Sequence, residues 1–437
     1  MLFLVRFERY FFQIGYNAAN VVCGTNLKSE AFAVFAAIEQ KIVFPGMLYH
    51  QFSKGAFQLR LIGNYALFVD SLGRGENGCH LSKPEEKTQY IYFFVLKWYT
   101  FINTEKEMTN LELRRNNTLD VIKLFASYMV VFVHAVFYGK LGVLAAALAR
   151  FAVPLFFLVS GFYAYKAPAK VLKRRMLRLL RLYLFAALAY TVYNVLIRLL
   201  HGNPQDVAAY LRAYANPNAL LKLILLNLTI CSAHLWYLLA GVYVYGIFYF
   251  AAKYNVSEKL IFIVSLLALL LHLFLGEVLS VFERYFPLYY VRNFALFGVP
   301  FFGFGLLVNK HQEKLRTIPG FVIPLSGVAG VFATVLSRYL LCGQELYAGS
   351  LLMVFSLVLV FLKFPNVSYP RWLLTLTGCS TYIYICHPLL SSIMKELYAA
   401  FSIPYADSAA LQIIHPLFIC VLSTAVAYGL NKVTKRK

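Results

Sequence analysis

The sequence predicts an all-α protein, a polytopic integral membrane helical bundle of about ten transmembrane helices. Of its 437 residues, 60% are hydrophobic and only 14% are charged, whereas a soluble domain usually carries about 25% charged residues. Apolar runs of roughly 20 residues recur from about residue 118 to the end, and an α-helix needs this length to cross about 30 Å of hydrocarbon. The runs are too uniformly apolar for barrel strands, in which apolar and polar residues alternate.

The expected helices can be placed along the chain one by one. We expect them at residues 118–138, 142–165, 179–201, 234–252, 260–278, 290–309, 318–337, 346–363, 372–394 and 411–430. Residues 207–230 are only half apolar and contain Asn216-Pro217-Asn218. They therefore predict an interfacial or re-entrant helix instead of a full span.

The first 107 residues differ from the rest of the chain. They contain short aromatic runs, no convincing 20-residue span and no secretory signal pattern. Their net charge is +2, whereas residues 108–437 carry 30 Lys and Arg against 10 Asp and Glu, a net charge of +20. We expect a membrane domain over 108–437 that starts naturally at Met108, with residues 1–107 as an extension that is not native. A genuine peripheral amphipathic segment is the alternative.

The positive charge in the loops predicts an orientation. If the membrane domain begins on the inner side, the inner loops and the tail carry 18 Lys and Arg, and the outer loops carry 7. Cytoplasmic loops of membrane proteins are enriched in Lys and Arg, so we expect a multi-pass cell-membrane protein with both termini cytoplasmic. This placement also explains the basic composition without a nucleic-acid partner.

The seven cysteines are scattered through the chain. They form no Cys-x-x-Cys pair, and most lie in the expected spans. Buried free cysteine behaves as a small apolar residue, so the sequence predicts packing roles and neither a disulfide nor a metal site.

Polar side chains line one face of the first expected span. At 100° per residue, all of them lie within about 60° of Asp120 on the helix; they are Asn116, Lys123, Ser127 and His134. Ionisable residues inside a membrane are rare and usually face the protein interior. The pattern favours a functional site, and the alternative is a packing stripe with a Lys–Asp pair and a satisfied buried histidine.

This pattern resembles the first helix of the acyltransferase 3 family. Members commonly have an Asp three residues before an Arg, and a His eleven residues after that Arg. Asp120 and His134 stand at the matching positions, with Lys123 in place of the Arg and Asn116 in place of an earlier Arg. Lysine retains the charge but cannot make the two-pronged contact of arginine. The resemblance implies catalytic roles for His134, Asp120 and Lys123, and substrate contacts for Asn116 and Ser127.

The next segment, residues 150–162, resembles the family's second helix, which ends in a Ser-Gly-Phe motif. A small residue such as Gly161 lets a neighbouring helix or ligand approach closely.

The basic run that follows, residues 170–181, resembles the family's Arg-x-x-Arg motif, which is associated with the acyl donor. Arginine clusters suit the phosphates of coenzyme A, although a topology signal on anionic lipid is the alternative. The residues implied in donor binding are Arg174, Arg175, Arg178 and Arg181.

Two later segments resemble family motifs as well. Residues 233–237 match a His-Leu-Trp-Tyr signature, and residues 378–388 match a late helix that ends in Tyr-x-x-His-Pro. Ordinary interface anchors and a structural polar cluster are the alternatives. The resemblance implies substrate contacts for His234, Trp236, Tyr384 and His387.

The resemblance covers about residues 110–432 and implies an integral membrane O-acyltransferase. Such an enzyme moves an acyl group, here expected to be acetyl from acetyl-CoA, to a hydroxyl of a surface polysaccharide or lipid-linked glycan. The expected partners are thus acyl-CoA, a glycan acceptor and membrane lipid, with no metal and no nucleic acid. A multi-helix transporter or flippase and a non-catalytic membrane sensor on the same fold remain the rival classes.

Overall fold

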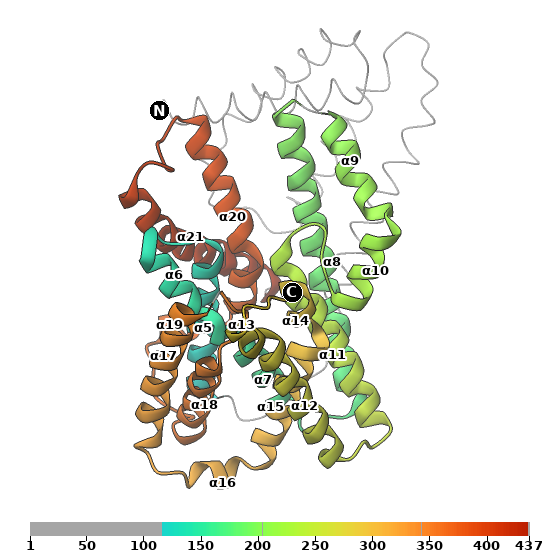
Figure 1. Cartoon of the computed structure of the whole chain (residues 1–437), viewed down its shortest axis with the longest axis vertical. Helices are drawn as coiled ribbons and strands as arrows, with labels where there is room; N and C mark the ends of the chain where they lie inside the picture. The colour runs from blue at the N-terminus through green and yellow to red at the C-terminus, as the bar shows by residue number, and fades with distance from the viewer. Residues whose placement is uncertain (1–115, 203, 342, 436–437) are drawn as a thin grey trace, which may run out of the picture. The chain divides into compact units, whose positions relative to one another are not determined.

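The computed structural model describes residues 116–435 except 203 and 342, so the expected extension over residues 1–107 lies outside the described residues. Every regular element in the described part is helical (Figure 1), which confirms the all-α prediction. The helices are α5 (Asn117–His134), α6 (Gly139–Leu148), η1 (Ala149–Phe151), α7 (Ala152–Phe162), α8 (Ala169–Leu200), α9 (Pro204–Ala215), α10 (Pro217–Leu226), η2 (Ala233–Leu235), α11 (Trp236–Lys253), α12 (Glu258–Leu273), η3 (Phe274–Val278), α13 (Leu279–Val281), α14 (Leu288–Val291), η4 (Phe294–Gly298), α15 (Val299–Lys310), α16 (Gln312–Arg316), α17 (Val322–Leu340), α18 (Ala348–Lys363), α19 (Arg371–Thr377), α20 (Ser380–Ala400) and α21 (Ala409–Lys435).

The prediction of about ten spans is not confirmed. Each expected segment falls on a helix, but within the described residues six helices are long and apolar enough to cross a membrane. The number is seven if α19 and α20, which are bent by 70° at their junction, form one span. The helices over 294–310 and 348–363 are shorter apolar segments, and α5 carries ionisable residues and is not among the six.

The half-apolar stretch after α8 forms two short helices, α9 and α10. Asn216 separates them, because its side chain accepts hydrogen bonds from the backbone N–H groups of Asn218 and Ala219 and so begins a new helix. Pro217 occupies the first helical turn, where its missing N–H has no cost. With 12 and 10 residues, neither helix alone spans about 30 Å of hydrocarbon.

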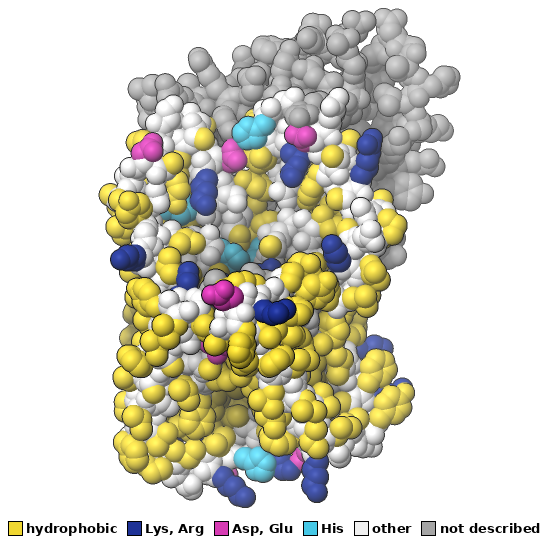
Figure 2. All heavy atoms as spheres, viewed as in Figure 1, with side chains coloured by type: hydrophobic (Ala, Val, Ile, Leu, Met, Phe, Trp, Pro, Cys, Tyr) yellow, Lys and Arg dark blue, Asp and Glu magenta, His cyan; other side chains and the backbone are white. Residues whose placement is uncertain are grey.

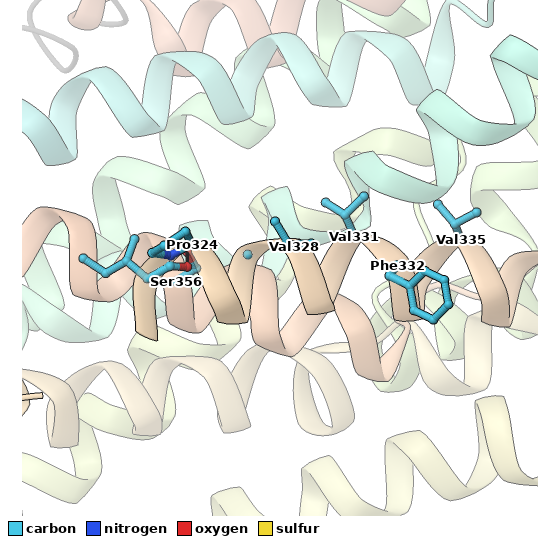
Figure 3. A pocket seen from close by; sticks show the side chains of 8 residues that line it. Pro324, Val328, Val331, Phe332, Val335 and Ser356 are labelled. Atoms are coloured by element: carbon cyan, nitrogen blue, oxygen red, sulfur yellow. Dashed lines mark hydrogen bonds between the residues drawn. The ribbon is translucent and has the colours of Figure 1, made fainter. Parts of the chain in front are cut away.

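The outer surface of the bundle is strongly apolar. Figure 2 shows hydrophobic side chains over most of the lower part of this face, with charged side chains gathered at its lower end. A shallow groove along α17 belongs to this surface (Figure 3). Val328 and Phe332 in the groove are 69% and 68% exposed. Apolar exposure on this scale suits lipid, and none of the candidate site residues lines the groove.

Helix α5 lies among the other helices. It packs against α6, α7, α18, α19, α20 and α21. Asn116 begins the helix by accepting a hydrogen bond from the Leu119 N–H at 2.8 Å, and its amide donates to the Phe361 carbonyl at 2.9 Å. A helix with a polar stripe must be enclosed by protein in this way, because lipid cannot solvate its charges.

Helices α7 and α15 approach each other closely at two glycines. A Cβ atom added to Gly161 would lie 1.9 Å from the Phe302 carbonyl oxygen, and one added to Gly305 would lie 2.0 Å from the Leu158 carbonyl oxygen. Asn309 then joins the ends of the two helices, since its amide donates to the Phe162 carbonyl at 2.8 Å. The Ser-Gly-Phe motif therefore serves this helix contact.

We expect Gly161→Ala to lower the thermal unfolding midpoint of the detergent-purified protein. The new methyl group must push two backbones apart, and overpacking of this kind costs about 1–3 kcal/mol. Gly429→Ala is the matched control, because Gly429 lies in α21 with nothing within 4 Å of its added Cβ, and alanine favours a helix. Equal midpoints for the two variants would contradict the packing role of Gly161.

Candidate active site

Three histidines from separate elements meet inside the bundle. His134 is the last residue of α5, His234 lies in η2, and His387 lies in α20. The ring centroid of His134 lies 5.3 Å from that of His387 and 5.9 Å from that of His234, and the latter two are 5.8 Å apart. The sequence predicted a role for each of these residues, and the structure brings them together as a histidine cluster.

The members of the histidine cluster differ in accessibility. His234 and His387 are 2% and 0% exposed, whereas the His134 residue is exposed. His134 is therefore the most accessible residue of the three.

The two buried rings each have one nitrogen without a partner. Nδ1 of His387 lies 3.0 Å from the Ile383 carbonyl, and since a carbonyl only accepts, Nδ1 carries the proton and Nε2 holds a lone pair. Nδ1 of His234 bonds the Ser232 hydroxyl at 2.8 Å. Nε2 of both rings is buried without a hydrogen-bond partner. Unpaired buried polar atoms are rare, so these two atoms are candidates for contact with a ligand.

Tyrosines fix the positions of the buried histidines. The Tyr384 hydroxyl donates to the His234 carbonyl, which ties α20 to η2. The Tyr190 hydroxyl donates to the Ile385 carbonyl at 2.8 Å and accepts from the Leu389 N–H at 3.0 Å. The Tyr190 hydroxyl therefore bridges the Leu389 N–H group and the Ile385 carbonyl, which lie four residues apart on α20. The Tyr190 ring also lies 4.9 Å from the His234 ring.

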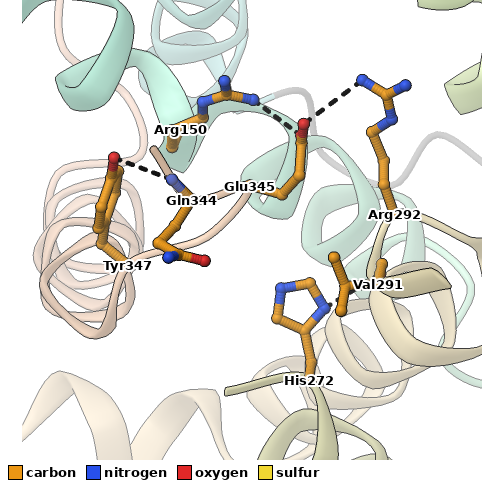
Figure 4. A network of polar contacts seen from close by, with 7 residues as sticks. All are labelled: Arg150, His272, Val291, Arg292, Gln344, Glu345 and Tyr347. Carbon is orange, nitrogen blue, oxygen red and sulfur yellow. Dashed lines mark hydrogen bonds and ion pairs between the residues drawn. The ribbon is translucent and has the colours of Figure 1, made fainter. Parts of the chain in front are cut away.

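An ionic cluster accompanies the histidines (Figure 4). Glu345 accepts from Nη1 of Arg150 at 2.8 Å and from Nη1 of Arg292 at 3.4 Å, so the two guanidinium groups flank one carboxylate. Glu345 is 6% exposed, and the arginine side chains are 24% and 22% exposed. The charges of all three side chains act on the His134 ring. We call these three residues the arginine–glutamate cluster.

The remaining predicted residues of α5 lie away from the histidine cluster. Asp120 and Lys123 form an ion pair of 2.7 Å, and Asp120 precedes His134 by 14 residues, about 21 Å along a helix. Ser127 is buried and donates to the Lys123 carbonyl at 2.9 Å. Asn116 caps the helix. Direct contact of Asp120 or Lys123 with the His134 ring is therefore excluded by the helix geometry.

The predicted donor site lies in the first turns of α8. Arg175 donates to the Tyr163 carbonyl at 2.8 Å, which fixes the turn between α7 and α8. Arg174 and Arg178 are exposed and Arg181 is half-buried. Tyr190 follows Arg178 by 12 residues, so α8 leads from the arginines to the histidine cluster over about 18 Å.

Within the described ranges, no group of three or more His, Cys, Asp or Glu residues is arranged to hold a metal ion.

Trp236, another predicted residue, is 6% exposed and packs against Phe297, with ring centroids 5.5 Å apart. The guanidinium carbon of Arg292 lies 5.8 Å from the Trp236 ring centroid. Trp236 therefore contacts the arginine–glutamate cluster through the Arg292 guanidinium.

Sequence reasoning assigned no role to the arginine–glutamate cluster or to Tyr190. One signal was present for Arg150, because it lies inside the expected span 142–165, and an ionisable residue within a span is a functional indicator. Arg292 and Glu345 stand at the edges of expected spans, where charges are common. Only the fold shows that they pair.

A helical bundle with lipid-suited surfaces and a reachable histidine among buried polar groups defines an integral membrane protein with an internal site. The chain matches the family model for the acyltransferase domain of acyltransferase 3 over residues 116–432 and belongs to this family. No curated protein and no solved structure matches the chain. Membership of the family supports a membrane acyltransferase.

We expect Glu345→Gln to destabilise the protein, because it leaves two partly buried guanidinium groups without a counter-charge. Removing one partner of a buried ion pair costs about 3–5 kcal/mol, and partial exposure of the arginines reduces the expected loss to about 2 kcal/mol. Thermal unfolding in detergent measures the change. Glu313→Gln is the control, since Glu313 forms an exposed pair with Arg316. If both variants unfold at the wild-type temperature, the arginine–glutamate cluster is not structurally important.

Proposed function

We propose that this chain is an integral membrane O-acyltransferase that moves an acetyl group from acetyl-CoA to a hydroxyl of a surface polysaccharide or lipid-linked glycan. The family supports the class of reaction. The observation that carries the proposal is that His134, an exposed residue, lies beside two buried histidines with unpaired Nε2 atoms. A reactive group must be reachable by substrate, and His134 meets this condition.

In the proposed reaction, His134 takes the proton of the acceptor hydroxyl. A neutral imidazole suits this step near pH 7, because its unperturbed pKa is about 6.5. The acceptor oxygen then attacks the thioester carbonyl, the C–S bond breaks, and the thiolate of CoA leaves with the proton from His134. Alternatively, His134 carries the acetyl group itself before passing it to the acceptor. Both routes yield the same acetyl ester and free CoA.

The donor is proposed to enter from the end of the bundle that holds Arg175. Basic residues lie at this end. Arg175 donates to the Tyr163 carbonyl directly after α7, and Lys363 donates to the Arg316 carbonyl at 3.0 Å. Asn309 and Phe162 join α15 and α7 at the same end. With the phosphates of CoA on the α8 arginines, the thioester end would extend about 18 Å along α8 to the histidine cluster.

The charge bias of the loops supports a cytoplasmic location for this basic end, with both termini inside the cell. The acceptor would then approach His134 from the opposite side. Charge-assisted, two-pronged hydrogen bonds make arginine a suitable group for the donor phosphates, and Asp120 and Lys123 would lie beside the donor's path instead of at the reacting atoms.

Labelled acetyl-CoA incubated with the purified protein in detergent tests the proposed class of function. An acyltransferase releases CoA and yields an acetylated glycan when an acceptor is added. A transporter, a flippase or a membrane sensor produces neither product.

We expect His134→Ala to remain expressed and membrane-inserted but to lose at least about 10²-fold in acetyl transfer, the lower end for removal of a general base. His134→Gln should be equally inactive, because glutamine forms hydrogen bonds but does not accept a proton near pH 7. Transfer rates are compared at matched protein levels. Near-normal turnover by the glutamine variant would show that His134 has only a packing role.

We expect Arg178→Ala to raise the KM for acetyl-CoA, and Arg178→Lys to restore it only in part, because lysine lacks the two-pronged geometry. Steady-state kinetics at saturating acceptor measure the effect. If the basic run acts only as a topology signal, both variants retain the wild-type KM, since the same loop keeps six other positive charges.

A further inference from the structure

The side chain of Arg292 has an unused hydrogen-bonding edge. Its Nη1 atom donates to Glu345, whereas its Nε atom is buried and has no hydrogen-bond partner. Nε and Nη2 form the other edge of the planar guanidinium, and two parallel N–H groups on one edge match the two oxygens of a carboxylate or phosphate. The side chain as a whole is 22% exposed, so a ligand can reach part of the guanidinium.

The three charges of the arginine–glutamate cluster do not balance. Arg150 and Arg292 together carry +2, and Glu345 supplies −1. A neutral His272 does not alter this sum. Its Nδ1 donates to the Val291 carbonyl at 3.1 Å (Figure 4). An uncompensated charge in a partly buried membrane site is unfavourable. A ligand with one negative charge would neutralise the cluster.

The fold holds Arg292 in a defined position. Asn293 follows it and accepts hydrogen bonds from Ala295 N–H and Leu296 N–H at 2.9 Å each, which begins the π-helical turn η4. Asn227, which is fully buried, accepts from Phe294 N–H at 2.8 Å and donates to the Trp236 carbonyl at 3.5 Å. These bonds attach the Arg292 turn to the helix of Trp236, so little conformational freedom is lost when a ligand binds.

We propose that the Nε–Nη2 edge of Arg292, whose guanidinium lies against the Trp236 ring, binds a carboxylate or phosphate group of the acceptor. This inference rests on the proposed function and adds the substrate class, an acidic glycan or a glycan on a phosphate-bearing carrier. The anionic group lies on Arg292, and the hydroxyl to be acetylated lies at His134, whose ring is under the influence of the same charges. The donor phosphates are served by the arginines at the start of α8, about 18 Å away along that helix from Tyr190.

Binding without turnover provides the first test. The probes are glucuronate, glucose 1-phosphate and neutral glucose, each titrated into the full chain in detergent and followed by calorimetry. We expect at least one of the two anions to bind about tenfold or more tightly than glucose, as a charge-assisted contact predicts. The carboxylate and phosphate probes distinguish an acidic sugar from a phosphate-bearing carrier.

Three variants locate the contact. Arg292→Gln should abolish the preference for the anion, and Arg292→Lys should keep only part of it. Arg284→Gln removes an exposed arginine from the segment before α14 and should bind as the wild type does. Equal binding of all probes by the wild type, or wild-type anion binding by Arg292→Lys, overturns the proposal. If Arg292→Gln does not fold, the lysine variant decides.

Kinetics separate this role from catalysis. Arg292→Gln should raise the KM for the anionic acceptor by about tenfold or more and leave the KM for acetyl-CoA and the acceptor-free release of CoA unchanged. An equal loss of kcat with anionic and neutral acceptors would assign Arg292 to the transition state or to packing, and would overturn the proposal. Absence of any acetyl transfer by the wild type would refute the proposed function, whereas the calorimetry would still decide whether Arg292 binds an anion.

Discussion

The fold depends on the need to keep the ionisable groups of α5 away from lipid. A charged side chain in hydrocarbon is costly unless protein or water surrounds it, and α5 carries Asp120, Lys123 and His134 along a single helix. Six other helices pack around α5, and Asp120 and Lys123 neutralise each other. The apolar helices with exposed leucine, valine and phenylalanine side chains can then occupy the periphery, where contact with lipid is favourable.

The bundle has two chemically different regions joined by α8. Basic side chains near the first turns of α8 face solvent, whereas Tyr190 on the same helix touches the histidine cluster. A helix is stiff over this distance, so the spacing between the two regions is set by the chain itself and not by a flexible loop. This arrangement suits a substrate with a charged head and a reactive group at the end of a long arm.

The sequence was sufficient to place the helices and to identify the three histidines, because both depend on local signals: apolar run length and short motifs. The number of about ten spans is not confirmed, because several of the expected apolar runs form helices that are short or interrupted, as α15 and α18 illustrate. The arginine–glutamate cluster could not be predicted. Arg150 and Glu345 are 195 residues apart, and only helix packing brings them within hydrogen-bond distance.

The Tyr190 hydroxyl has a consequence for how the protein opens. It contacts both the Leu389 amide and the Ile385 carbonyl, directly after Pro388, which itself has no amide hydrogen. A side chain of α8 therefore adds hydrogen bonds to α20 at the point where proline removes one. We expect the Leu389 amide to exchange with deuterium faster when α8 moves away, so that α8 and this part of α20 open together.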